Sequence, residues 1–286
     1  MNELPKINEN LYKAWYFQLP VQYKLCEYTK NREFACLSKI IPQKSIRTLR
    51  VHTPQHFQFW TQKVLRNKVQ PEPYYNYYFS LATYKGGLPL QSASLRHRNN
   101  DDFKQNHHKR MVSYDMLIDI DAYDLNQVME AYDQTKNIVG MMKTPFYLSF
   151  SGLGFHIRIP HEYLPAFSLD PSSNLNIYEY VASMQKKLHK KYDLVDCRIN
   201  DSRRLCKIPY TLSVYADKTY SVCFPFVTIE EFERFNLDMI SVDYWMRQDI
   251  RSRKAGLINE KKPVIQHKNG TKTVIRHKNG TYEVKK

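Results

Sequence analysis

The segment 114–123, YDMLIDIDAY, constrains the fold more than any other part of the chain, because its apolar residues enclose two carboxylates. Successive side chains of a β-strand point to opposite faces. Ile118 and Ile120 are therefore expected to enter a core, while Asp119 and Asp121 project together from the other face. Adjacent carboxylates repel, and a divalent cation or a shared proton stabilises such a pair. The segment therefore predicts an oxygen-ligand site for Mg²⁺ or Mn²⁺, against the alternative of a strand with two solvated acids.

The charge balance predicts a polyanionic partner. The 286 residues are 42% hydrophobic, enough for a globular core, and 43 Lys and Arg against 28 Asp and Glu give a net charge of +15. Nucleic acid is the first candidate partner. Residues 251–286 carry eleven Lys or Arg against two Glu, which indicates either a nucleic-acid contact or a solvated basic tail.

The cysteines and the hydropathy pattern predict a soluble protein that is not secreted. Five cysteines form no CxxC pair and are odd in number, which disfavours both a zinc ribbon and a disulfide framework. The N-terminal segment is too polar for a secretory signal, and no apolar run approaches the ~18–20 residues needed to cross a bilayer. We expect a cytoplasmic protein, or a nuclear one in a eukaryote, with no membrane partner.

Hydrophobic periodicity predicts an α+β fold in which helices back a sheet. Two identical Asn-Gly steps in the repeats VIQHKNGTKT and VIRHKNGTYE predict small hairpins near the C-terminus. The expected helices are 8–30, 54–68, 126–142 and 174–192; the expected strands are 74–84, 116–125 and two within 145–160, with more after 194, and 91–113 is expected to be a surface loop.

A second segment, SFSGLGFHIRI at 149–159, predicts a phosphate cradle. His156 and Arg158 fall on one face of an alternating strand that follows a Gly-x-Gly turn. Glycine backbone N–H groups approach anions closely, and Ser, His and Arg side chains add donors. A lone structural histidine after an ordinary turn is the competing interpretation. The candidate phosphate-binding residues here are Ser151, Gly152, Gly154, His156 and Arg158.

A third segment, 195–212, combines an acid with nearby cations. Asp196 follows an apolar residue, and Arg204 and Lys207 lie a few residues downstream. Such a combination suits a metal ion and a phosphate bound together, while a salt-bridged surface strand is the alternative.

Taken in order, these segments resemble the small catalytic subunit of archaeo-eukaryotic primases and the wider primase-polymerase superfamily. MLIDIDAYD resembles the apolar-D-x-D motif, SGLGFH the Ser-Gly-x-Gly-x-His motif, and VD at 195–196 the third acid. NREFACL at 31–37 and YYFSLATY at 77–84 extend the resemblance toward the N-terminus. DSRRLCKIPYTL at 201–212 follows the run D-x-x-R-L-x-R-x-P-x-S-L, with Lys207 for Arg and Thr211 for Ser. The resemblance covers roughly residues 30–215.

The resemblance implies a primase-polymerase catalytic fold with an RRM-like mixed β-sheet flanked by helices. It places one catalytic domain at 1–250, with an N-terminal helical and β part at 1–90 and a metal and nucleotide core at 110–225. The basic tail, 251–286, would follow.

The resemblance also implies template-directed, two-metal nucleotidyl transfer that makes or extends primers on single-stranded DNA from nucleoside triphosphates. Two Mg²⁺ or Mn²⁺ ions would be held by Asp119, Asp121 and Asp196, with Asp201 a second candidate for the third acid. Ser151, His156, Arg204 and Lys207 would contact the nucleotide. A helicase or an accessory primase subunit is an expected partner.

Two departures and several alternatives stay open. Leu153 stands alone between the two glycines where many cellular primases have an extra residue, often Arg, so we expect Arg158 to substitute for a missing phosphate contact. Ser213 replaces a family histidine, and the family's cysteine-bearing zinc element has no counterpart, so no structural zinc is expected. The alternatives are an RRM-like nucleic-acid-binding module, a catalytically silent primase paralogue, and an end-joining or gap-filling polymerase. The choice between ribo- and deoxynucleotides is not specified by these motifs.

Overall fold

The computed structural model describes most of the chain. The expected loop 91–113 and helix 54–68 fall largely outside it. The described residues are 3–40, 46–49, 51, 53–58, 74–85, 110–170, 172–198, 201, 204–254 and 256–259, with short strands between 266 and 285.

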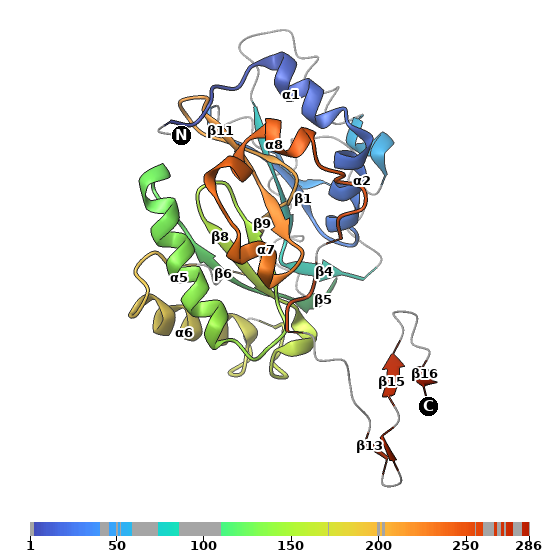
Figure 1. The fold of residues 1–286 in the computed structure, drawn as a ribbon. Helices are drawn as coiled ribbons and strands as arrows, with labels where there is room; N and C mark the ends of the chain where they lie inside the picture. Colours follow the sequence, from blue (N-terminus) through green and yellow to red (C-terminus); the bar gives the residue numbers. More distant parts are fainter. Residues whose placement is uncertain are drawn as a thin grey trace.

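Two four-stranded antiparallel sheets form the centre of the molecule (Figure 1). The first sheet has the order β2 (Ile46–Leu49), β1 (Phe34–Ser38), β3 (Tyr75–Ser80) and β9 (Leu205–Lys207). The second has the order β12 (Phe224–Phe226), β7 (Tyr147–Phe150), β8 (Phe155–Ile159) and β6 (Met116–Ile120). Four smaller pairs are β4 (Ala82–Tyr84) with β5 (Met111–Tyr114), β10 (Leu212–Val214) with β11 (Tyr220–Val222), β13 (Gln266–His267) with β14 (Gly270–Thr271), and β15 (Thr273–Arg276) with β16 (Tyr282–Lys285).

The helices follow the apolar periodicity, with one interruption. The expected helix 8–30 is two helices, because α1 ends before Phe17 and α2 restarts with Pro20 in its first turn, where a missing N–H is tolerated. Asn8 caps α1 by accepting from the N–H of Leu11. The helices are α1 (Glu9–Tyr16), α2 (Leu19–Tyr28), α5 (Val128–Met141), α6 (Ile177–His189), α7 (Ile229–Glu233) and α8 (Val242–Met246), with 3₁₀ turns η4 (Leu125–Gln127), η5 (His161–Tyr163) and η6 (Leu237–Ile240).

Strand alternation gives the second sheet an apolar face and a polar face. Ile120 pairs with Phe155 on the apolar face, where the Phe155 ring lies 6.1 Å from that of Tyr132 in α5. Asp119 pairs with His156 on the polar face. Helices α5 and α6 both contact the second sheet and lie together beside it in Figure 1. The prediction that isoleucines and acids of this segment separate onto opposite faces is therefore confirmed for the part of it that forms a strand.

The polar face of the second sheet looks toward the first sheet. Cys206 of β9 contacts His156 of β8, and the Arg158 guanidinium lies 5.6 Å from the ring centre of Phe79 in β3. His156 and Arg158 thus share one face, as their spacing predicts, and that face lies between the two sheets.

The α+β class is confirmed, but the expectation of a mixed sheet is wrong for both large sheets. Every strand ladder in the described residues is antiparallel. The reason is that β7 and β8 form a hairpin and β8 also pairs with β6, so β6 and β7 run in the same direction without touching. No helix in this part of the chain has the length and apolar character required to cross a bilayer.

Candidate active site

The first two acids lie where β6 ends. Asp119 is within the strand, whereas Asp121 follows its last residue, Ile120. Gly154 packs against this point, since a Cβ on Gly154 would overlap the Ile120 carbonyl oxygen and lie 3.0 Å from the Cα of Asp121. A glycine is therefore required for the turn of the SGLGFH segment to sit against the acids.

The third acid reaches the first two through backbone hydrogen bonds. Asp196 donates its N–H to the Asp119 carbonyl at 2.8 Å, and Asp121 donates to the Leu194 carbonyl at 2.9 Å. Residues 194–196 therefore extend the second sheet beside β6. Asp201, the second candidate, has a different neighbour, because its carbonyl accepts the Tyr114 hydroxyl at 2.8 Å.

The pKa values of Asp119 and Asp121 are shifted in opposite directions. Burial, followed by the charge of Asp119, raises the pKa of Asp121 to about 7, and Asp196 adds to this effect although part of the Asp121 side chain reaches solvent. Burial also opposes ionisation of Asp119, but the nearby charges of His156, Arg204 and Lys207 hold its pKa below the usual value. At neutral pH the pair therefore carries less than two full charges.

His156 connects the acids to β9. Its Nε2 lies 3.1 Å from Oδ1 of Asp119, and its Nδ1 lies 3.3 Å from the Sγ of Cys206. Although burial favours the neutral ring, Asp119 and then Cys206 raise the pKa of His156 well above its ordinary value. Asp119 and Cys206 thus favour the protonated form of this buried ring.

Two more cations lie beside the acids. Arg204 Nη2 is 3.5 Å from Oδ2 of Asp196. Lys207 donates to the hydroxyl of Ser213, and its Nζ lies 5.7 Å from the ring centre of Tyr78. Burial lowers the pKa of Lys207, but Tyr78 and other neighbours outweigh it, so the net shift is upward. Lys207 therefore stays charged between the sheets.

The turn that holds Ser151 and Gly152 is fixed by its own hydrogen bonds. Ser151 donates its N–H to the Gly154 carbonyl at 2.9 Å, and Ser221 donates its hydroxyl to the Gly152 carbonyl at 2.9 Å. Gly152 has a φ of +129°, and a Cβ there would lie 2.7 Å from the Tyr215 hydroxyl oxygen. The glycines are therefore explained by close packing, and the role of the Ser151 side chain as a phosphate donor stays a prediction.

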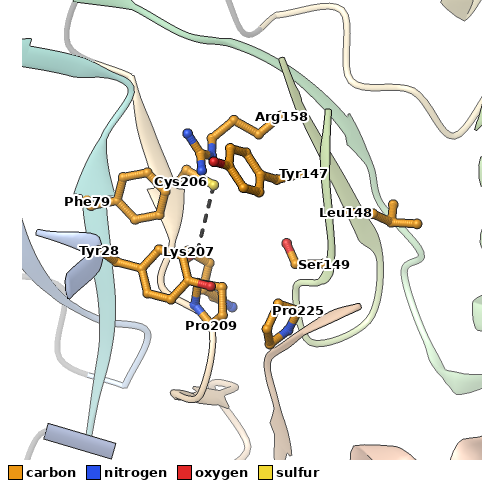
Figure 2. A pocket seen from close by; sticks show the side chains of 10 residues that line it. All are labelled: Tyr28, Phe79, Tyr147, Leu148, Ser149, Arg158, Cys206, Lys207, Pro209 and Pro225. Atoms are coloured by element: carbon orange, nitrogen blue, oxygen red, sulfur yellow. Dashed lines mark hydrogen bonds between the residues drawn. The ribbon is translucent and has the colours of Figure 1, made fainter. Parts of the chain in front are cut away.

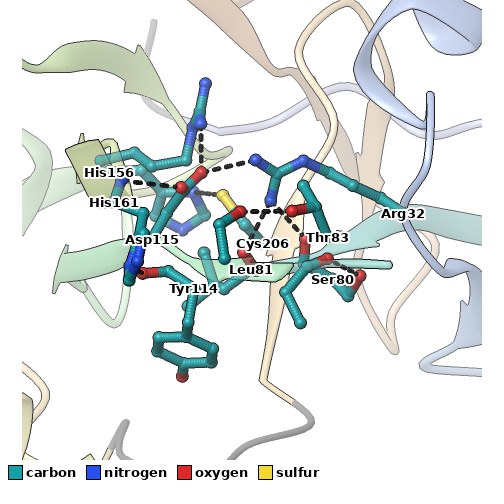
Figure 3. Close-up of polar contacts among 12 residues, drawn as sticks. Arg32, Ser80, Leu81, Thr83, Tyr114, Asp115, His156, His161 and Cys206 are labelled. Carbon is teal, nitrogen blue, oxygen red and sulfur yellow. Dashed lines mark hydrogen bonds and ion pairs between the residues drawn. The ribbon is translucent and has the colours of Figure 1, made fainter. Parts of the chain in front are cut away.

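Arg158 is engaged by a buried carboxylate that the sequence did not single out. Asp115 is 2% exposed and forms ion pairs with Arg158 and, at 2.7 Å, with Arg32 (Figure 3). Burial opposes the charge of Asp115, but the two guanidinium groups hold its pKa below the usual value. The role of Arg158 in phosphate binding stays a prediction, and its position is set by Asp115 and by the Tyr147 ring 4.3 Å away. A lone acid before an apolar run was the available signal for Asp115, but its partners come from distant segments.

A small pocket of about 20 Å³, partly open to solvent, lies between the two sheets next to these groups (Figure 2). Its wall combines three aromatic rings with two cations and the thiol that contacts His156. The lining residues are Tyr28, Phe79, Tyr147, Leu148, Ser149, Arg158, Cys206, Lys207, Pro209 and Pro225. The sequence pointed to Arg158 and Lys207 but not to the aromatic wall.

The acids suit a divalent cation in part. Oδ1 of Asp119 is buried and accepts no well-aligned hydrogen bond from the described residues, and the raised pKa of Asp121 reflects repulsion that a cation relieves. However, no three His, Cys, Asp or Glu side chains in the described segments are grouped closely enough to hold one ion. Both oxygens of Asp196 face arginines, Arg198 at 3.2 Å and Arg204 at 3.5 Å. A metal held by all three acids therefore requires Asp196 to leave at least one of these arginines.

No known protein-family profile matches the chain, and a search of curated proteins finds no significant match. The fold and the site define an α+β protein in which acids and cations from distant segments meet between two sheets. Its assignment to a function depends on the motifs and on this geometry.

Proposed function

We propose that the chain is a primase-polymerase that makes or extends primers on single-stranded DNA by template-directed nucleotidyl transfer. The observation that carries the proposal is the meeting of three motifs. Oδ1 of Asp119 lies 3.1 Å from Nε2 of His156, and the Asp119 carbonyl accepts the backbone N–H of Asp196 at 2.8 Å. These residues belong to the D-x-D, Ser-Gly-x-Gly-x-His and third-acid motifs, which are far apart in the sequence.

The chain's own residues would bind and orient the two substrates. Lys207 is a half-buried cation on the polar face, placed to donate charge-assisted hydrogen bonds to the triphosphate. Both ring nitrogens of His156 contact Asp119 and Cys206, so His156 would bind a phosphate oxygen by giving up one of these contacts. Arg204, whose Nη2 lies 3.5 Å from Oδ2 of Asp196, adds a further cation beside the acids. Two Mg²⁺ or Mn²⁺ ions bound by Asp119, Asp121 and Asp196 would activate the attacking 3′-oxygen and stabilise the leaving pyrophosphate.

Ser213 gives this proposal a specific feature. Its hydroxyl accepts a hydrogen bond from Lys207 and occupies the place of a family histidine. We infer that Ser213 orients Lys207. A histidine of the family would then be replaced here by a neutral residue that positions the Lys207 ammonium group.

The RRM-like binding module is the main alternative, and burial argues against it. Such modules bind bases on aromatic rings exposed on the sheet face. Phe155, the corresponding aromatic residue of SGLGFH, is 0% exposed and faces α5, and the opposite face lies against the first sheet. A binding module also has no use for a carboxylate such as Asp119 buried beside a histidine.

An incorporation assay tests the proposal. The purified protein is given unprimed single-stranded DNA, Mg²⁺ or Mn²⁺, and either ribo- or deoxynucleotides; a primed template is given in parallel. Products from unprimed DNA indicate a primase, and extension of primers alone indicates an end-joining or gap-filling polymerase. Binding with no incorporation under any condition would refute the proposal and favour the binding module or the silent paralogue.

Matched variants locate the activity in the proposed site. Asp119→Asn, Asp121→Asn and Asp196→Asn should each abolish incorporation while the circular dichroism spectrum is unchanged. Asp133→Asn removes the same charge from an exposed position on α5 and should incorporate as the wild type does. Normal turnover in any of the three site variants removes that residue from the centre.

A further inference from the structure

An exposed aromatic ring lies immediately beside the acids. Tyr123 is 83% exposed, more than any other large hydrophobic side chain in the described segments, and it follows Asp121 by two residues. The neighbouring core contains many buried tyrosines, such as Tyr114 at 0%. A ring left in solvent at the edge of a candidate active site is a candidate contact for a ligand.

The backbone under this ring is held in place. Tyr123 donates its N–H to the side-chain oxygen of Gln127 at 3.0 Å. Asp124 caps the following 3₁₀ turn by accepting from the N–H groups of Asn126 at 2.8 Å and Gln127 at 3.1 Å. Both contacts fix the direction in which the chain leaves Asp121. The exposure of Tyr123 therefore belongs to a structured turn, and its ring is preorganised for contact.

A solvent-facing cation accompanies the ring. The Arg198 side chain is 88% exposed, and its Nε lies 3.2 Å from Oδ1 of Asp196. The same oxygen accepts the backbone N–H of Arg198 at 2.9 Å. The ring and the cation flank the same acids, because Asp196 donates its N–H to the Asp119 carbonyl and Tyr123 follows Asp121 by two residues. Because Nε binds the acid, the terminal nitrogens of the guanidinium extend toward solvent.

We propose that Tyr123 and Arg198 form a clamp for single-stranded DNA at the entrance to the acid site. The ring stacks on a base, and the guanidinium binds the adjacent phosphate. Stacking on an aromatic ring tolerates any base, which suits a template read by base pairing. The inference rests on the proposed function for its choice of partner, and the net charge of +15 agrees with that choice.

The other cations of the site make a strand of DNA a better occupant of the clamp than a free nucleotide. His156 and Lys207 lie between the sheets, where a triphosphate would be enclosed. Tyr123 and Arg198 are on the solvent side of the same acids. A template strand must reach the acids from solvent, and the clamp lies on the solvent side of those acids.

Equilibrium binding of an oligothymidylate of about 12 nucleotides tests the clamp. Fluorescence anisotropy is measured on the full chain without metal or nucleotide. Tyr123→Ala should weaken binding about tenfold, whereas Tyr123→Phe, which keeps the ring, should stay within about twofold. Arg198→Gln should weaken binding and lower the slope of log K against log salt by about one. Tyr23→Ala is the control, since Tyr23 is 57% exposed on α2, and its affinity should equal that of the wild type.

The outcomes separate the clamp from the proposed function. If the wild type binds DNA through Tyr123 but incorporates no nucleotide, the clamp stands and the polymerase proposal fails. If the protein incorporates nucleotides while Tyr123→Ala binds as tightly as the wild type, the clamp is wrong and the polymerase proposal stands. Equal losses in Tyr123→Ala and Tyr23→Ala, or no oligothymidylate binding by the wild type, also overturn the clamp.

Discussion

Replacing Gly154 by alanine should displace the acids and remove most of the activity. A Cβ at Gly154 would overlap the carbonyl oxygen of Ile120 and lie 3.0 Å from both the Ile120 carbonyl carbon and the Cα of Asp121. Carbon atoms in contact normally lie about 3.5–4.0 Å apart, so the two backbones must separate by roughly 1 Å. Misplacement by about 1 Å at a reacting centre costs on the order of 100-fold in rate.

The same substitution should lower stability, because two backbone segments cannot move apart without losing contacts. Overpacking of this kind costs about 1–3 kcal/mol in free energy of unfolding. Gly140→Ala in α5 is the matched control, since no atom lies within 4 Å of the position that a Cβ would take there. That variant should keep full activity and be unchanged or stabilised by up to about 1 kcal/mol.

Urea unfolding and steady-state incorporation measure the two effects on the same preparations. The expected result is a folded Gly154→Ala protein with a lower urea midpoint and about 100-fold lower kcat/KM. Refutation would be a Gly154→Ala protein that matches Gly140→Ala in both stability and turnover. The contact between the SGLGFH turn and the acid segment would then have no role in placing Asp121.

Three further predictions concern charge. Asp115→Ala should lower the free energy of unfolding in urea by about 3–5 kcal/mol, because it leaves two buried guanidinium groups unpaired. Lys6→Ala, which removes an ion pair exposed on both sides, should cost under about 1 kcal/mol. Similar costs for the two variants would contradict the buried cluster. The pKa of Asp121 is about 7 against an ordinary 3.8, so the native state binds more protons between these pH values and metal-free stability should fall as pH rises. Thermal melts of Asp121→Asn should lack this slope, and Mg²⁺ at pH 8 should stabilise the wild type more than the variant; parallel curves would argue against the raised pKa. Lys207→Ala should lower kcat/KM for the nucleotide about 10- to 100-fold, with Lys207→Arg retaining most of it, and an unchanged kcat/KM would exclude Lys207 from nucleotide binding.

Local patterns in the chain were enough to predict the principal elements near the site. Alternating apolar residues predict β6 and β8, and helical periodicity predicts α5 and α6, because each pattern depends only on neighbouring residues. The same alternation predicts that His156 and Arg158 share a face. β6 ends at Ile120, five residues before the predicted end, and Asp121 lies just beyond the strand, where the backbone packs against Gly154.

Partners from distant segments could not be predicted. Asp115 is followed by an apolar run, but its ion pair with Arg32 joins residues 83 positions apart. The contact of Cys206 with His156 likewise depends on β9 being in the first sheet and β8 in the second. Neither pairing has a local signal, because each is created by the packing of one sheet on the other.

The amino-acid sequence by itself determined which residues are candidates for the site, since acids, glycines and cations stand at spacings that strand geometry converts into faces. Only the tertiary structure decided how those residues are charged and what holds them. Partial burial and the charge of Asp119 raise the pKa of Asp121, contact with Asp119 and Cys206 raises the pKa of His156, and an ion pair joins Arg158 to Asp115. These properties depend on distance and solvent exclusion, which arise when segments remote in sequence pack together.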